Sequence, residues 1–341
     1  MQPPSPGLPR RRDLTVDEYV TGVRAGDRAV LGRAISLIES NARAHREHAE
    51  AVLTALLPHT GGAHRVGISG VPGVGKSTFV EALGTRLTGA GKKVAVLAVD
   101  PTSARTRGSI LGDKTRMTLL SQDPRAFIRP SPSSGSLGGV GRKTRETLLL
   151  CEAAGFDVVL VETVGVGQSE TMVAELVDFF LVLLLAGAGD ELQGIKRGIL
   201  ELADMLAVNK ADGDNEKRAD RARREYASAL ELLHANTKEA WQVPVLTCSA
   251  RTGAGIDALW AEVTRHHREA DASGRLAARR QTQQLRWMWQ MVDGELLAAL
   301  RRHPEVSRAL PALERALAAG SLTATAAARS ILDAFGLTPD P

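Results

Sequence analysis

Residues 65–78 read Arg-Val-Gly-Ile-Ser-Gly-Val-Pro-Gly-Val-Gly-Lys-Ser-Thr, and this stretch decides the fold. An apolar, β-like run leads into a segment, Gly70–Ser77, that matches G-x-x-x-x-G-K-[ST] without deviation, and a helical pattern follows it. A strand before this motif and a helix after it are the context in which it forms a phosphate-binding loop. A chance glycine-rich turn would not explain the strand, the helix, the lysine and the serine together.

The residue types of this loop suit a phosphate ligand. Glycine permits backbone angles that aim several N–H groups inward, and the N-terminus of the following helix adds positive potential. Lys76 supplies a charge for the β- and γ-phosphates, and Ser77 supplies a hydroxyl for Mg²⁺. The predicted phosphate-loop residues are Gly70, Val71, Pro72, Gly73, Val74, Gly75, Lys76, Ser77 and Thr78.

Short apolar runs alternate with helical patterns on both sides of the loop. The predicted strands are 65–69, 93–99, 126–128, 157–161, 179–185, 205–208 and 243–247, and the predicted helices are 77–90, 140–154, 192–202, 216–233 and 256–269. Near-continuous apolar strands between helices are typical of a mostly parallel sheet covered on both faces. The predicted fold class is therefore α/β, a doubly wound P-loop domain that binds its ligand at the carboxyl ends of the strands.

Helical patterns flank this domain at both ends. The predicted organisation is a disordered Pro-rich leader at 1–14, a helical region at 15–62, the P-loop domain at 63–271 and a helical region at 272–341. In the last region an apolar stripe runs through Leu285, Met288, Val292, Leu296 and Leu300. The stripe suits either a dimer contact or the core of a helical layer.

The composition narrows the class of protein. Net charge is +4 and no basic tract is long, so nucleic acid is not an expected partner. The longest apolar run, 177–188, is interrupted by Asp178 and is too short to span a bilayer. Cys151 and Cys248 are far apart and are predicted to be buried thiols, which fits a cytoplasmic protein. His266 and His267 are expected at a solvated helix end.

A second motif, Asn209-Lys210-Ala211-Asp212, follows a predicted strand and indicates which base is bound. The Asp212 carboxylate can accept hydrogen bonds from N1–H and N2–H₂ of guanine, a donor pair that adenine lacks, and a site built this way rejects the wrong base strongly. Asn209 would hold the loop. After the next strand, Ser249, Ala250 and Arg251 resemble the loop that contacts guanine O6. The motif alone is weak, but its order after a phosphate loop favours GTP over ATP.

Carboxylates at other strand ends are candidates for the metal site. Glu162 ends an apolar strand at the position where most small GTPases carry Asp, and it can reach Mg²⁺ directly or through a water. The alternative is a glutamate that only caps the strand. Asp100, after another strand, and Asp113, in a charged loop that is a candidate first switch, are the further candidates for direct or indirect metal contacts.

Two more segments have the composition of switches. Residues 165–170 are small and glycine-rich, and Gln168 among them is a candidate for orienting the attacking water. Residues 186–196 form a third Gly-rich charged loop with Asp190, Glu191 and Lys196. Nucleotide chemistry alone does not demand this third loop, which suggests that it relays the nucleotide state to a partner.

Taken together, these segments resemble the methylmalonyl-CoA mutase-associated GTPases. The segments that carry the resemblance are 70–78, 99–103, 161–170 and 189–196, and it extends over nearly the whole chain. It implies a P-loop GTPase with an N-terminal helical region and a C-terminal dimerisation arm. It also implies GTP hydrolysis that gates the loading of adenosylcobalamin into an acyl-CoA mutase and supports its reactivation.

The same resemblance assigns roles to individual residues. Lys76 and Ser77 would bind phosphate and Mg²⁺, and Asp100, Asp113 and Glu162 would form the metal network. The third switch would couple the nucleotide to the mutase, and no cobalamin site is expected on this chain itself. Two alternatives remain: a metal-insertion GTPase, which usually carries Cys/His clusters that this chain lacks, and a transport-associated kinase or ATPase, which the guanine motif disfavours.

Overall fold

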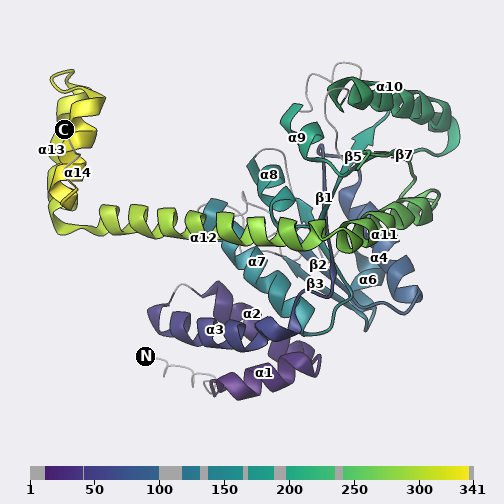
Figure 1. The fold of residues 1–341 in the computed structure, drawn as a ribbon, viewed down its shortest axis with the longest axis horizontal. Coiled ribbons are helices and arrows are strands. Elements are labelled where there is room, and N and C mark those ends of the chain that lie inside the picture. Colours follow the sequence, from purple (N-terminus) through teal and green to yellow (C-terminus); the bar gives the residue numbers. More distant parts are fainter. Residues whose placement is uncertain are drawn as a thin grey trace, which may run out of the picture. The chain divides into compact units, whose positions relative to one another are not determined.

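The computed structural model describes residues 12–40, 42–99, 117–130, 137–163, 168–187, 197–234 and 241–337. Seven parallel strands form one sheet in the order β3-β2-β4-β1-β5-β6-β7 (Figure 1). The chain therefore adopts the doubly wound α/β fold expected from the alternation of apolar runs and helical patterns.

The strands lie close to the predicted ranges. They are β1 (His64–Gly70), β2 (Val94–Val99), β3 (Ala126–Pro130), β4 (Val158–Thr163), β5 (Phe179–Leu185), β6 (Met205–Asn209) and β7 (Val245–Thr247). The last strand begins two residues later than predicted, because Pro244, which cannot donate to a ladder, precedes it.

The helices of the nucleotide-binding part are α4 (Lys76–Gly89), α6 (Thr118–Gln122), α7 (Leu137–Ala153), α8 (Gln168–Ala174), α9 (Arg197–Leu202), α10 (Glu216–His234) and α11 (Ile256–Ala272). Two of them, α6 and α8, were not predicted, since five or seven residues are too few for a helical period to stand out. The expected helix at 192–202 is described only from Arg197.

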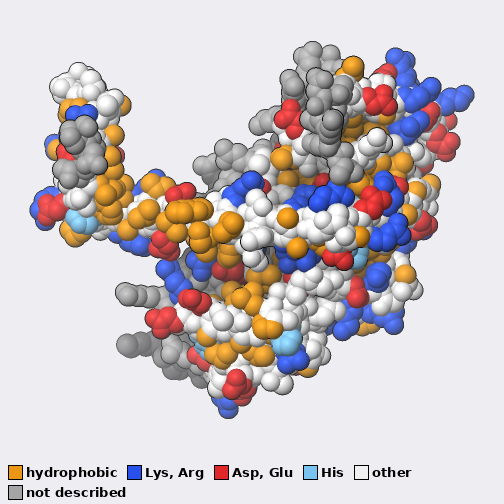
Figure 2. Space-filling model, in the orientation of Figure 1, with side chains coloured by type: hydrophobic (Ala, Val, Ile, Leu, Met, Phe, Trp, Pro, Cys, Tyr) orange, Lys and Arg blue, Asp and Glu red, His pale blue; other side chains and the backbone are white. Residues whose placement is uncertain are grey.

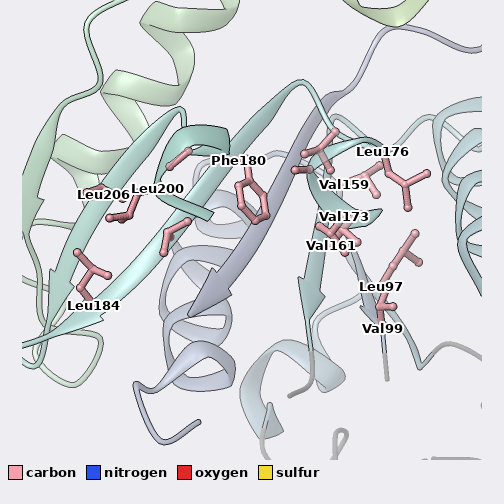
Figure 3. Packing of buried hydrophobic residues seen from close by; sticks show 14 of the residues in the cluster. Leu97, Val99, Val159, Val161, Val173, Leu176, Phe180, Leu184, Leu200 and Leu206 are labelled. Atoms are coloured by element: carbon pink, nitrogen blue, oxygen red, sulfur yellow. The ribbon is translucent and has the colours of Figure 1, made fainter. Parts of the chain in front are cut away.

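The two faces of the sheet form separate cores. Along β1, Val66 and Ile68 face the core that includes α4, α6 and α11, whereas Gly67 lies under Val173 of α8 on the other face. That second core also takes side chains from α7, α9 and α10 (Figure 3). Helices cover both faces of the sheet. A ligand can therefore meet polar groups of the central strands only at the ends of these strands.

Three N-terminal helices, α1 (Val16–Arg24), α2 (Arg28–Glu39) and α3 (Arg43–Leu56), form a third core against α7. Asp27 caps α2 by accepting hydrogen bonds from Ala29 and Val30. The Arg28 guanidinium donates to the carbonyl of Ala126 at 2.6 Å, and Arg129 pairs with Glu39. Both contacts tie α2 to β3, the strand at one edge of the sheet.

His266 is not at a solvated helix end, so that expectation is wrong. It is buried in the middle of α11 against Phe179 and Trp241, and burial lowers its pKa. Asp204 directly precedes β6. Its two carboxylate oxygens each accept a hydrogen bond from one guanidinium nitrogen of Arg279, both at 3.1 Å. These contacts hold α11 and the first residues of α12 (Arg275–Arg302) at the amino ends of the strands.

The described chain separates into two compact units, residues 1–279 and 280–341. In the second, the remainder of α12 is followed by α13 (Pro304–Ala318) and α14 (Ala324–Phe335), which pack against each other. Pro304 begins α13, and Gly320 lies in the connection between α13 and α14. No helix of the described chain is both long and apolar enough to serve as a membrane span.

Gly67 gives the first testable prediction. A Cβ at this position would lie 2.9 Å from side-chain atoms of Phe180 and Val173, so Gly67→Ala must push α8 away from β1. Overpacking of this kind costs about 1–3 kcal/mol of the free energy of unfolding, measurable by urea denaturation.

Gly32 provides the matched control, since it lies within α2 and a Cβ there would meet nothing within 4 Å. Gly32→Ala should stabilise by about 0.5–1 kcal/mol because alanine favours the helix. Equal effects of the two substitutions would contradict the close packing of α8 on β1.

Candidate nucleotide-binding site

The predicted phosphate loop lies between β1 and α4, at the carboxyl end of the central strand. Gly70 has φ 147° and a Cβ there would lie 2.4 Å from the carbonyl oxygen of Leu183. Gly75, with φ 96°, occupies the N-cap of α4, where a Cβ would meet the side-chain nitrogen of Asn209 at 2.9 Å. The motif therefore needs glycine at both positions for steric reasons.

Lys76, the first residue of α4, turns back over the loop. Its Nζ donates to the carbonyl oxygens of Gly70 at 2.6 Å and Val71 at 3.2 Å. Burial lowers the pKa of Lys76, and the nearby carboxylates of Glu162 and Glu170 oppose that shift. The ammonium group thus lies where a phosphate chain would replace the two carbonyl groups as its partner.

Ser77 and Glu162 meet at the ends of different elements. The Ser77 hydroxyl donates to Oε1 of Glu162 at 2.8 Å, and the Glu162 side chain is buried at the end of β4. A hydroxyl and a carboxylate are the hard oxygen donors that Mg²⁺ prefers. The pair fits a metal at this position better than a glutamate that merely caps a strand, because Glu162 contacts the loop serine.

The guanine motif is joined directly to the phosphate loop. Asn209 Nδ2 donates to the carbonyl of Val74 at 2.8 Å, and Lys210 Nζ donates to the carbonyl of Gly73 at 2.8 Å. Lys210 adopts φ 61°, a strained conformation for a residue with a side chain. The predicted base-reading segment and the predicted phosphate loop are therefore hydrogen-bonded to each other.

The loop after β7 contacts the predicted base-reading residues. Ser249 Oγ and the Arg251 guanidinium both donate to the Asp212 carboxylate, one to each oxygen. The Ala250 N–H donates to Oδ1 of Asn209 at 3.1 Å. Both oxygens that would read guanine are thus held by this loop, and a base would compete with Arg251 for one of them.

Cys248 also contacts Asn209. Its Sγ lies 3.6 Å from Oδ1 of Asn209, and burial raises the pKa of the thiol to about 12, so it stays protonated and donates. Cys151 is also buried, as predicted. Arg86 of α4, which pairs with Asp257 and donates to the Gly253 carbonyl at 3.2 Å, further ties α4 to this loop.

Several predicted site residues lie outside the described residues. They are Asp100, Asp113 of the first candidate switch, and Asp190, Glu191 and Lys196 of the third. Gln168 is described only as the first backbone position of α8. Among the described candidates, the structure brings together Lys76, Ser77 and Glu162 on one side and Asn209, Asp212, Ser249, Ala250 and Arg251 on the other.

A sequence model described as methylmalonyl Co-A mutase-associated GTPase MeaB matches residues 31–305. The chain belongs to the MeaB family. Among its relatives, a putative GTPase of Caulobacter vibrioides is 56% identical over 95% of this chain and 99% of its own length. The mitochondrial methylmalonic aciduria type A homolog of Mus musculus is 46% identical over 96% of this chain and 81% of its own length.

One solved structure is similar to this chain over most of its length. The crystal structure of LAO/AO transport system kinase has a TM-score of 0.76 and 39% sequence identity, and the match covers 95% of this chain and 99% of that chain. Family membership and the shared fold identify this MeaB-family protein as a GTP-hydrolysing enzyme. The expected family and activity are thereby confirmed.

Asp212→Asn tests the base-reading assignment. The amide can donate to the C2 oxygen of xanthine but no longer accepts two hydrogen bonds from guanine, so preference should shift from GTP to xanthosine triphosphate. We expect GTP affinity to fall by about a hundredfold or more, measured by titration calorimetry.

Asp214→Asn is the matched control. Asp214 is exposed two residues away, so its substitution makes the same change of charge outside the base site. Unchanged GTP affinity in Asp212→Asn would show that another group reads the base.

Proposed function

We propose that this MeaB-family GTPase is a chaperone of an adenosylcobalamin-dependent acyl-CoA mutase of the methylmalonyl-CoA mutase type. In this role, GTP hydrolysis gates loading of the cofactor into the mutase and supports replacement of damaged cofactor. The family description, which names the mutase, carries the proposal, and the name of the mouse relative is consistent with it. No cobalamin site is proposed on this chain.

The proposed hydrolysis depends on the residues at the carboxyl ends of β1 and β4. Backbone N–H groups of the loop and the Lys76 ammonium bind the phosphates, with Ser77 and Glu162 as the proposed holders of Mg²⁺. When bound, Mg²⁺ neutralises charge that develops on the β- and γ-oxygens. Asp100 and Asp113 are proposed for the same metal network, and Gln168 for orienting the water.

The proposed base selection depends on Asp212, with Asn209 and Lys210 holding the two loops together. Coupling to the mutase is proposed for the third switch, with Asp190, Glu191 and Lys196. In this scheme GTP is the timing signal, and the cofactor transfer takes place on the partner.

A homodimer formed through α12 is part of the proposal. Leu285, Trp289, Val292 and Leu296 recur at helical spacing and are 54%, 60%, 40% and 55% exposed. Figure 2 shows apolar side chains gathered along this helix. An exposed apolar stripe of this kind marks a protein interface, and a second copy would present the same stripe.

The name of the solved LAO/AO transport system kinase favours a second candidate, a kinase that serves transport. Such an enzyme would transfer the γ-phosphate to a protein or small molecule. The Asn209–Asp212 segment, which contacts the phosphate loop, favours GTP over ATP and so disfavours an ATP-dependent kinase.

The decisive experiment measures GTP hydrolysis with and without purified B12-dependent mutases. A cognate mutase should raise kcat by about tenfold or more, because the partner completes the switch conformation that the chain alone samples rarely. The Lys76→Ala variant, which lacks the phosphate-binding ammonium, is the control and should show no stimulated turnover. Transfer of γ-phosphate to an acceptor, with no response to any mutase, would favour the kinase instead.

A further inference from the structure

A buried chain of polar side chains lies directly beneath the phosphate loop. Thr163 Oγ1 donates to Ser69 Oγ at 3.0 Å, and Ser69 Oγ donates to Oε1 of Glu170 at 3.5 Å. The three residues are 0%, 0% and 3% exposed. They belong to β4, β1 and α8, so one chain of hydrogen bonds joins three elements.

Each member of the chain adjoins a part of the nucleotide site. Thr163 follows Glu162, and Ser69 precedes Gly70, the first glycine of the loop. Glu170 lies in the first turn of α8, which begins at Gln168. The Lys76 ammonium interacts electrostatically with both Glu170 and Glu162. Movement of α8 relative to β1 would therefore alter the base of the loop and the end of the metal-binding strand.

Packing and polar contacts hold α8 on the same face of β1. Gly67 and Ser69 are two residues apart in the strand and so face the same way. The missing side chain at Gly67 lets Val173 approach closely, and Ser69 meets Glu170 one helical turn earlier in α8. The apolar contact sets how deeply α8 lies, and the polar chain sets where its first turn lies along the strand.

A carboxylate at this depth is costly unless it is hydrogen-bonded and near a positive charge. An apolar residue would fill the same space at less cost to stability. A hydrogen-bond acceptor at this depth is thus better explained by the position that it fixes than by stability.

We propose that Glu170 is a positioning residue for GTP hydrolysis. Through Ser69 and Thr163, it fixes the first turn of α8 against the base of the phosphate loop and the end of β4. The inference concerns hydrolysis by the chain alone, so it stands or falls independently of the mutase.

The test compares three variants in steady-state GTP hydrolysis and in GDP binding. Glu170→Ala removes the end of the chain and should lower kcat by about tenfold to a hundredfold, because small displacements of reacting groups are that costly. GDP affinity should change by less than about threefold, because ground-state contacts are kept. Glu170→Gln retains an acceptor for Ser69 and should keep kcat within about threefold of the wild type.

Thr163→Val removes the other end of the chain while keeping its shape, and it should also lower kcat. Combined with Glu170→Ala it should add little further loss, because both substitutions break one unit. Glu146, a buried carboxylate on α7, is the control: Glu146→Ala should lower thermal stability and leave kcat unchanged.

Three results would overturn the proposal. They are a kcat of Glu170→Ala within about twofold of the wild type, a proportional loss of GDP affinity, and full additivity with Thr163→Val. If Glu170→Ala does not fold, the other two variants decide alone. An unchanged kcat in Thr163→Val would contradict the proposal. A loss of kcat in Glu170→Gln as large as the loss expected for Glu170→Ala would contradict it as well.

Discussion

The parallel pairing of β1 with β4 places Ile68 opposite Glu162, and the nucleotide site depends on this register. Because the strands run parallel, their carboxyl ends meet at one edge of the sheet, where the phosphate loop leaves β1 and Glu162 is the last but one residue of β4. The Ser77 hydroxyl reaches that carboxylate only in this arrangement. A register shift by one residue would turn Glu162 to the other face of the sheet and separate the pair.

The two ends of the sheet have different tasks. At the carboxyl end, polar side chains gather around the predicted phosphate loop: Lys76, Ser77 and Glu162 at its helix end, and Asn209 and Asp212 beside it. At the amino end, Asp204 joins β5, α11 and the start of α12 through Phe180, His266 and Arg279. The short strand β6 lies between the two, with Asp204 before it and Asn209 at its end. The amino end is thus joined to neighbouring helices, and the candidate site lies at the carboxyl end.

Sequence reasoning identified the family, the fold and the loops because their signals are local. Gly70 and Gly75 adopt positive φ angles that the loop motif signals by itself, and the apolar composition of the strands indicates their burial. The sequence could not predict features that depend on a contact with a residue distant in sequence. In the sequence alone His266 resembles an exposed helical residue, and only its contacts with Phe179 and Trp241 reveal that it is buried. Helix α8, with seven residues, is too short to show a helical periodicity in its sequence. Glu170 lay inside a recognised segment, but only the distance to Ser69 reveals its place in a buried chain.

Dependence of GTP hydrolysis on Mg²⁺ concentration in Glu162→Gln tests the central claim most directly. The amide still accepts the Ser77 hydrogen bond, so the fold and the loop should be retained, while the charged metal ligand is lost. The account predicts that half-maximal hydrolysis requires about tenfold more Mg²⁺ than in the wild type. An unchanged Mg²⁺ requirement would contradict the claim that the β1–β4 register builds the metal site.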